Sequence, residues 1–264
     1  MVQSAEMDQK GHVAVIGAGV IGLSCAVQLA QGGHLVTVIA RELPGDWDID
    51  YASPRAGAHF RPVPLKTEQD VFENELMLES YDEFRRLADD NGLKEAGVEF
   101  VPALEYFEKS LSGSDLEMFS KWPGYRLLNA DELPSGGKAS AIKAGLTYDA
   151  WVVNSPVYLK WLQRQAEDCG AIFVKARLSA PQEAAFIAEA TRPNACRPTV
   201  IVNASGMGFG DPACFPSRGQ FILVSNSYGR TVNHHSSDGN STVIIPRPLG
   251  GGSVIGGTKE PNNW

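Results

Sequence analysis

The sequence predicts an α/β fold, and three observations support that class. Residues 12–26 read as a short apolar strand, then Gly-x-Gly-x-x-Gly, then a helical segment, and a second strand follows at 35–39. A helix that begins at Ser155-Pro156, with strands at 171–175 and 199–203, continues this alternation of strands and helices. The last third contains short strands at 220–224, 243–245 and 253–255. Alternating strands and helices are typical of a parallel sheet covered by helices.

The glycine motif after the first strand predicts a dinucleotide site. Gly17 allows a sharp turn out of the strand, Gly19 lets the backbone approach a pyrophosphate, and Gly22 lets the helix pack closely on the sheet. The helix directs its free N–H groups and the positive end of its dipole toward the phosphates. We therefore expect the cofactor to be bound along the turn by Gly17, Ala18, Gly19, Val20, Ile21 and Gly22.

The end of the second strand leaves the identity of the dinucleotide open. An acidic residue that binds the ribose hydroxyls usually stands there, but this chain has Ala40 at that position. Glu42 can hold the ribose from slightly further along the chain. Arg41 can instead bind a ribose 2′-phosphate, which would indicate NADP. The motif by itself is compatible with FAD and with NADP.

Composition and charge narrow the class of protein. The chain has 264 residues, a formal net charge of −8 and 20% charged residues, which suit one large or two modest domains. The acidic balance and the scattered basic residues argue against a nucleic-acid partner. The four cysteines form no C-x-x-C pair, so we expect reduced intracellular thiols and no metal site. Residues 1–11 read as a polar tail, and no apolar run has membrane-spanning length.

Helix signals organise the middle of the chain. Thr67 is expected to cap a long helix whose apolar side faces the core through Phe72, Leu76, Tyr81, Phe84 and Leu87. Short strands are expected at 98–101 and 104–107, and 110–145 reads as irregular. The helix after Ser155-Pro156 is expected to bury Leu159, Leu162, Ala166 and Cys169, and a surface helix is expected at 182–190. His234-His235 reads as a solvated loop.

Motifs spread over nearly the whole chain resemble the D-amino acid oxidase family of flavoenzymes. The segments that carry the resemblance, in the family's order and spacing, are GAGVIGLS, VTVIARE, ASPRAGAHF, GLTYDAWVVNSPVYLKWLQRQAEDCGA, IVNASG, SRGQ, IIPRP and GGTKEPNNW. The resemblance implies FAD rather than NADP, with Arg41 beside the adenosine end. It further implies that the cofactor is bound by Arg41, Glu42, Ser53, Gly57, Ala58, His59, Leu178, Ser205 and Gly206, with the loop 53–59 on the flavin side.

The resemblance also implies a fold of two interleaved parts. One is a discontinuous Rossmann-like FAD-binding domain, expected at 12–60 and 147–224. The other is an α+β substrate domain on a mixed, largely antiparallel sheet, expected at 61–146 and 225–264. The implied reaction is oxidation of a D-amino acid, with hydride transfer to the flavin, hydrolysis of the imine to a 2-keto acid and ammonia, and reoxidation by oxygen to hydrogen peroxide. No catalytic side chain is required, a homodimer is compatible with the family, and the expected location is the cytoplasm or the peroxisome.

Departures from the family pattern affect the substrate pocket and the extent of the chain. Val243 and Lys259 stand where microbial members have tyrosines, so together with His59 they are the substrate-pocket candidates. An inward Lys259 would favour acidic substrates, as in D-aspartate oxidation. The family's substrate-clamping arginine and C-terminal helix have no counterpart before Trp264, so a C-terminally truncated chain with impaired activity is expected. The alternatives are an NADP-dependent dehydrogenase and a non-catalytic nucleotide-binding fragment.

Overall fold

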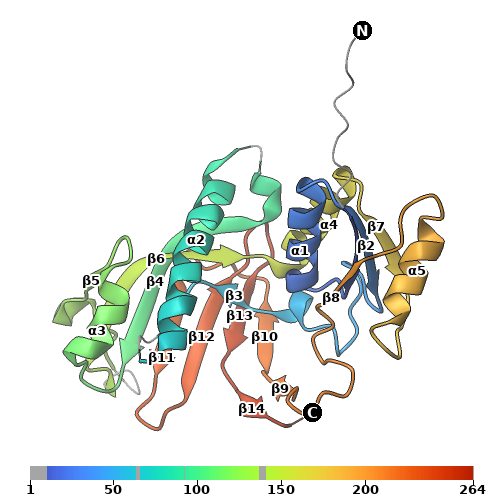
Figure 1. The fold of residues 1–264 in the computed structure, drawn as a ribbon. Coiled ribbons are helices and arrows are strands. Elements are labelled where there is room, and N and C mark those ends of the chain that lie inside the picture. Colours follow the sequence, from blue (N-terminus) through green and yellow to red (C-terminus); the bar gives the residue numbers. More distant parts are fainter. Residues whose placement is uncertain (1–10, 64–65, 92, 137–140, 264) are drawn as a thin grey trace. The chain divides into compact units, whose positions relative to one another are not determined.

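The computed structural model describes residues 11–63, 66–91, 93–136 and 141–263, arranged in two compact units (Figure 1). The polar tail expected at the N-terminus therefore lies almost entirely outside the described residues. The first unit joins the chain up to Ala56 with Pro156–Pro216. The second unit joins Gly57–Ser155 with Ser217–Trp264. Each unit is thus built from two separate segments of the sequence.

The first unit contains a four-stranded parallel sheet. Its order is β7-β2-β1-β8, so the first strand in the chain lies inside the sheet. The strands are β1 (His12–Ile16), β2 (Leu35–Ala40), β7 (Ile172–Lys175) and β8 (Val200–Asn203), and the helices are α1 (Val20–Gln31), α4 (Ser155–Asp168) and α5 (Glu183–Thr191). Figure 1 shows α1 and α5 on opposite sides of this sheet. On the α5 side, Ala184 and Ala188 pack against Ala14, Ile16 and Ile39.

The second unit contains a larger mixed sheet. Its strand order is β10-β13-β12-β11-β4-β6-β3, and every neighbouring pair is antiparallel except β4 and β11. The strands are β3 (Ala58–His59), β4 (Val98–Phe107), β6 (Ala144–Val153), β10 (Phe221–Val224), β11 (Thr231–His235), β12 (Ser241–Pro246) and β13 (Ser253–Gly256). Short β5 (Arg126–Leu127) pairs with β6, and β9 (Ser217–Arg218) pairs with β14 (Glu260–Pro261).

Two capped helices accompany this sheet. α2 (Glu68–Asp89) begins with a capping box in which Thr67 accepts from the Asp70 N–H and the Asp70 carboxylate accepts from the Thr67 N–H. α3 (Gly113–Ser120) begins with the same arrangement between Ser112 and Asp115. Single 3₁₀ turns occur at η1 (Ser53–Arg55), η2 (Lys94–Ala96) and η3 (Ala130–Glu132).

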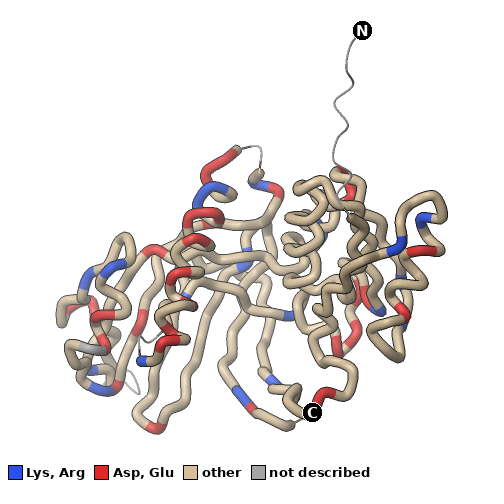
Figure 2. The backbone as a smooth tube through the Cα atoms, in the orientation of Figure 1, with Lys and Arg blue, Asp and Glu red and all other residues tan. Residues whose placement is uncertain are grey.

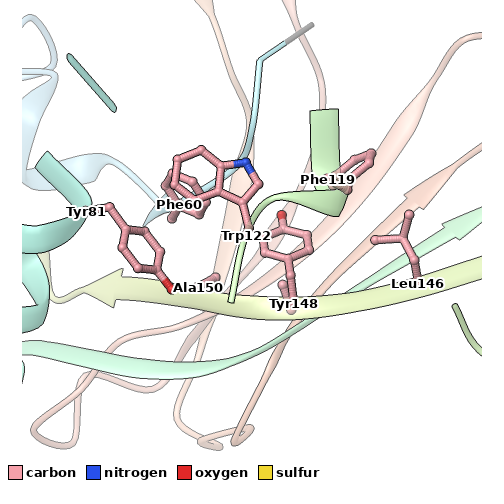
Figure 3. Packing of buried hydrophobic residues seen from close by; sticks show 8 residues of the cluster. Phe60, Tyr81, Phe119, Trp122, Leu146, Tyr148 and Ala150 are labelled. Carbon is pink, nitrogen blue, oxygen red and sulfur yellow. The ribbon is translucent and has the colours of Figure 1, made fainter. Parts of the chain in front are cut away.

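Aromatic side chains form the main core of the second unit. Figure 3 shows Leu146, Tyr148 and Ala150 rising from β6 beneath Phe119, Trp122 and Tyr81. Phe60 packs edge-on against Tyr81 and Trp122, with ring centroids 5.0 and 4.5 Å apart. Such edge-to-face pairs contribute beyond their buried area. This cluster covers one face of β4 and β6 with packed aromatic side chains.

The structure corrects several sequence-based expectations. Residues 98–107 form one strand instead of two, and α3, β5 and η3 lie within the segment expected to be irregular. His234 and His235 belong to β11 rather than to a loop. Phe72 and Leu76 of α2 are exposed, because the side of this helix that faces the protein carries Asn74, Tyr81 and Leu87 instead. Cys169 is also exposed, since α4 ends at Asp168.

The unit boundaries differ from the expected domain limits. Residues 147–153 belong to the second unit, because β6 is one continuous strand paired with β4. Residues 221–224 also belong there, because β10 pairs with β13. His59, in turn, forms β3 in the second unit rather than ending the first.

The surface charges are mixed in sign. Figure 2 shows acidic positions spaced along α2, and acidic and basic positions close together around α3 and β5. None of the helices among the described residues is long and apolar enough to cross a bilayer.

Candidate functional site

The turn between β1 and α1 has the geometry that only glycine permits. Gly17 has a φ of +97°, and a Cβ atom there would collide with the carbonyl of Ala204. A Cβ at Gly22 would collide with the Gly17 carbonyl oxygen. The Gly17 N–H donates to the Ile39 carbonyl at 2.9 Å, which ties the turn to β2. The steric needs for a tight turn and for close helix–sheet packing are therefore both present.

The N-terminus of α1 forms a cradle for an anion. Gly19 is the N-cap and makes no side-chain capping bond, and the first turn carries no acidic residue. Val20 and Ile21 are 41% and 69% exposed. The Ser53 hydroxyl accepts from the Val20 N–H at 3.1 Å and would lie 3.0 Å from a Cβ placed on Gly19. The first N–H groups of a helix have no partner within the helix, and here Ser53 meets only that of Val20, so the positive end of the helix dipole fits a pyrophosphate.

Tyr51 holds the following loop against this turn, a contact that the motif analysis missed. Its hydroxyl donates to the Ala18 carbonyl at 2.7 Å, and the side chain is buried. Burial, assisted by the carboxylates of Asp46 and Glu42, raises the pKa of Tyr51, so the hydroxyl remains a donor at neutral pH. Tyr51 is thus a positioning residue for the turn and for Ser53.

Arg41, directly after β2, is surrounded by carboxylates. Its guanidinium lies 3.3 Å from Glu42, 3.3 Å from Asp48 and 3.2 Å from Asp50. These three acidic groups compensate the single positive charge. A ribose 2′-phosphate brought to Arg41 would meet their negative field, which is unfavourable for NADP and compatible with the uncharged ribose of FAD.

The other first-unit candidates lie at the C-terminal ends of β7 and β8. Ser205 and Gly206 line a cavity of about 420 Å³ together with Asn203, Pro181 and Phe209. The Ser205 N–H donates to the Asn203 side chain at 3.2 Å, which fixes the loop after β8. Leu178 packs in the core beneath α5, next to Ala184 and Ile39, and is not among the residues that line this cavity.

The remaining candidates belong to the second unit. A Cβ on Gly57 would lie 3.1 Å from Ile245 and 3.2 Å from Val254, so the backbone there runs close to β12 and β13. Ala58 is half-buried and pairs with Val153. Val243 is half-buried on β12, directly opposite Asn233, whereas Lys259 is exposed between β13 and β14.

His59 is a half-buried histidine in β3, opposite Val152. Its Nδ1 atom is buried and has no hydrogen-bond partner. Burial lowers the pKa of His59 to about 4, with Arg61 acting in the same direction and Glu105 opposing it. The ring is therefore neutral at neutral pH.

A buried polar network next to Val243 was missed by the sequence analysis. The fully buried Glu105 accepts from the Tyr148 hydroxyl at 2.9 Å and from the Asn233 amide at 2.6 Å, and it contacts His235 Nε2 at 2.6 Å. The His235 ring stacks on Phe107, with centroids 4.5 Å apart. His234 lies 3.1 Å from Glu108. Both histidines thus pair with carboxylates, and among the described residues no three His, Cys, Asp or Glu side chains gather as a metal site.

Comparison with known proteins identifies relatives along almost the entire chain. The family model described as "DAO: FAD dependent oxidoreductase" matches residues 12–264. The D-aspartate oxidase of Talaromyces thermophilus is 34% identical over 96% of this chain and 71% of its own length. The D-amino-acid oxidase of Fusarium vanettenii is 32% identical over 96% of this chain and 72% of its own length.

Solved structures support the fold. Glycine oxidase from Bacillus cereus has a TM-score of 0.64 at 18% identity, and the match covers 96% of this chain and 72% of that chain. NikD, an amino acid oxidase essential for nikkomycin biosynthesis, has a TM-score of 0.67 at 16% identity, covering 96% and 71%. At these identities the agreement concerns the architecture, an α/β fold with a Rossmann-like sheet and a mixed sheet.

Proposed function

Because the chain belongs to the DAO family of FAD-dependent oxidoreductases, whose cofactor is FAD, we propose that it acts on D-amino acids. The products would be a 2-keto acid, ammonia and hydrogen peroxide, with oxygen as the second substrate. The relatives named D-aspartate oxidase and D-amino-acid oxidase support this substrate class. The structural observation that carries the cofactor assignment is the open N-terminus of α1 behind the glycine turn.

The proposal gives each part of the chain a role toward FAD. FAD supplies the hydride acceptor, and the protein binds and orients it. The turn at 17–22, through backbone N–H groups other than that of Gly17, would hold the pyrophosphate together with the Ser53 hydroxyl, and Arg41 with Glu42 would border the adenosine end. Leu178, Ser205 and Gly206 are proposed for the same cofactor from the ends of β7 and β8. Gly57, Ala58 and His59 would serve its flavin side from the second unit.

The cofactor assignment is tested by Gly19→Val. A branched side chain there would occupy the space of the phosphate and press on Ser53, so we expect the purified variant to lose its bound flavin. The measurement is the visible absorption spectrum after purification with added FAD. Gly113→Val is the matched control, because a Cβ at Gly113 meets nothing within 4 Å. A Gly19→Val protein as yellow as the parent would refute the assignment.

The substrate class divides into neutral and acidic D-amino acids. Lys259 is exposed, which favours neutral substrates, whereas the similarity to a D-aspartate oxidase favours acidic ones. A lysine that contacts the substrate carboxylate would favour acidic substrates by about 1–3 kcal/mol. Lys259→Tyr should therefore lower turnover of D-aspartate relative to D-alanine if Lys259 faces the pocket. An unchanged ratio would show that Lys259 does not contact the substrate. Neutral D-amino acids would then remain as the proposed substrates.

A peroxide assay tests the oxidase step itself. Residues 1–264 with added FAD are mixed with D-alanine and D-aspartate, and hydrogen peroxide is measured against a flavin-only blank. Peroxide from either substrate supports the proposal, while a yellow protein that produces none from a broad panel would retain the cofactor assignment and overturn the oxidase step. A homodimer and a cytoplasmic or peroxisomal location go with the proposal and are tested by gel filtration and by cell fractionation.

A further inference from the structure

We propose that the second unit carries a separate binding site for a small, neutral, largely apolar molecule, on the face of the mixed sheet opposite Val243. A cavity of about 410 Å³ opens there, a volume typical of small-molecule sites. Its floor consists of aliphatic side chains from four adjacent strands, Leu104, Val232, Ile244 and Ile255. Nothing in the proposed oxidase function uses this face.

The strand register separates this cavity from the substrate-pocket candidates. Val232 pairs with Leu104 and with Ile244, and Ile244 pairs with Ile255, so these four side chains share one face. Successive side chains of a strand point to opposite faces. Val243, next to Ile244, therefore points with Asn233 and Glu105 to the other side of the sheet.

A buried hydroxyl in the cavity wall lacks a partner. Ser253 lines the cavity, is 2% exposed, and its Oγ has no hydrogen-bond partner. An unpaired buried hydroxyl costs about 1–3 kcal/mol, so such groups usually meet a ligand or water. A ligand that fills the apolar floor and carries one hydrogen-bonding group would satisfy it.

The lining indicates a neutral ligand with a flat apolar part. Besides the aliphatic floor and Ser253, the wall contains Pro134, Val224, Asn226 and the two tyrosines Tyr106 and Tyr228, and it contains no ionisable acid or base other than these phenols. Burial raises the pKa of Tyr106, and the nearby Tyr228 contributes in the same direction to a smaller extent. The Tyr106 phenol therefore stays protonated. An aromatic alcohol combines a flat apolar body with a group that can both donate and accept.

Binding of 2-naphthol to the full chain tests the proposal. We expect saturable binding of one molecule per chain in equilibrium dialysis with FAD present, and the same binding to Gly19→Val without flavin. Tyr228→Ala, which removes an exposed wall residue, should abolish saturation, and Ser253→Ala should weaken binding about fivefold. Phe186→Ala removes another exposed aromatic side chain, on α5 in the first unit, and this control should bind as the parent does.

Four results would overturn the proposal. One is the absence of saturable binding to the parent. Another is binding that survives both Tyr228→Ala and Ser253→Ala, with far-UV circular dichroism showing folded proteins. The third is tighter binding of 2-naphthoate than of 2-naphthol, because a carboxylate would then be the recognised group. Binding lost in Gly19→Val but retained in Tyr228→Ala would assign the probe to the cofactor site and likewise refute the second site.

Discussion

Glu105 illustrates, at the scale of a single residue, how a carboxylate is accommodated in a core. Its two carboxylate oxygens form hydrogen bonds with Tyr148, Asn233 and His235. These residues lie on β6 and β11, the two neighbours of β4. A buried charge without such donors would cost several kcal/mol. The network also fixes the Asn233 amide, because only its NH₂ end can donate to Glu105. Its carbonyl oxygen is left buried without a partner, on the same face as Val243.

Tyr148→Phe should therefore destabilise the second unit. The change removes the hydroxyl that donates to Glu105 and leaves the ring packing against Phe60 and Phe119 in place. We expect a loss of about 1–3 kcal/mol in the free energy of unfolding, measured by urea titration. Tyr228→Phe is the control, since Tyr228 is 45% exposed and should lose far less. Equal losses in the two variants would show that the Glu105 contact contributes nothing.

His59 predicts a specific dependence of stability on pH. Burial holds its pKa at about 4, below the ordinary value of 6.5, so on acidification the unfolded chain takes up this proton before the folded chain does. The stability contributed by the neutral ring is complete above pH 6.5 and declines as the pH falls toward 4. The full decline corresponds to about 3 kcal/mol.

Urea unfolding of the parent and of His59→Asn at intervals from pH 7 to pH 4 measures this effect. Asparagine does not titrate, so the variant should lose less stability than the parent across that window. His34→Asn, in the first unit, serves as the matched histidine control. Parallel curves for the parent and His59→Asn would contradict the prediction.

At the scale of elements, β10 is an open edge of the mixed sheet. It ends the strand order, and Phe221, Ile222 and Leu223 are all substantially exposed, Ile222 at 65%. An exposed apolar edge strand is a template for pairing with other chains. Ile222→Lys should therefore raise the soluble fraction and reduce concentration-dependent light scattering. Phe186→Lys, on a helix, has similar exposure and should give a smaller gain.

Sequence patterns among neighbouring residues predicted some elements correctly. They could not predict elements that depend on contacts between residues far apart in the sequence. The strand, turn and helix of the glycine motif, the Thr67 cap and a helix at 182–190 were predicted from residues close in sequence, and the structure confirms them, with the last helix at Glu183–Thr191. β6 and β11 carry Tyr148, Asn233 and His235, whose polarity resembles that of a loop. Their partner Glu105 lies 43 to 130 residues away, so no local pattern shows that these polar groups are satisfied inside a sheet. Because of this separation in sequence, Glu105 was not predicted as part of the site.

Some features of the candidate site could likewise be predicted from local sequence, and others could not. The steric roles of Gly17 and Gly22 follow from the motif, and the structure shows the collisions that a Cβ would cause. The neutralisation of Arg41 by Asp48 and Asp50 depends on a loop conformation that the sequence does not specify. Roles toward the cofactor and the substrate remain predictions for all of these residues.

At the scale of the whole molecule, the chain passes between its two units three times, at 56/57, 155/156 and 216/217. Each unit consequently needs two distant segments before its sheet is complete. In the first unit, the interior strand β1 has one neighbour, β2, soon after it in the chain, and the other, β8, much later. In the second unit, β4 likewise has one neighbour nearby in the chain, β6, and another much later, β11.

This strand order sets a schedule for synthesis on the ribosome. β2 ends at Ala40 and β8 begins at Val200, so at about 5–20 residues per second β1 remains an open edge for roughly 10–30 s. During that interval a strand that is interior in the folded sheet lacks one of its two neighbours, which exposes it to pairing with other chains. β8 is translated before β11–β13, so the last strand of the parallel sheet leaves the ribosome before the strands that complete the second sheet.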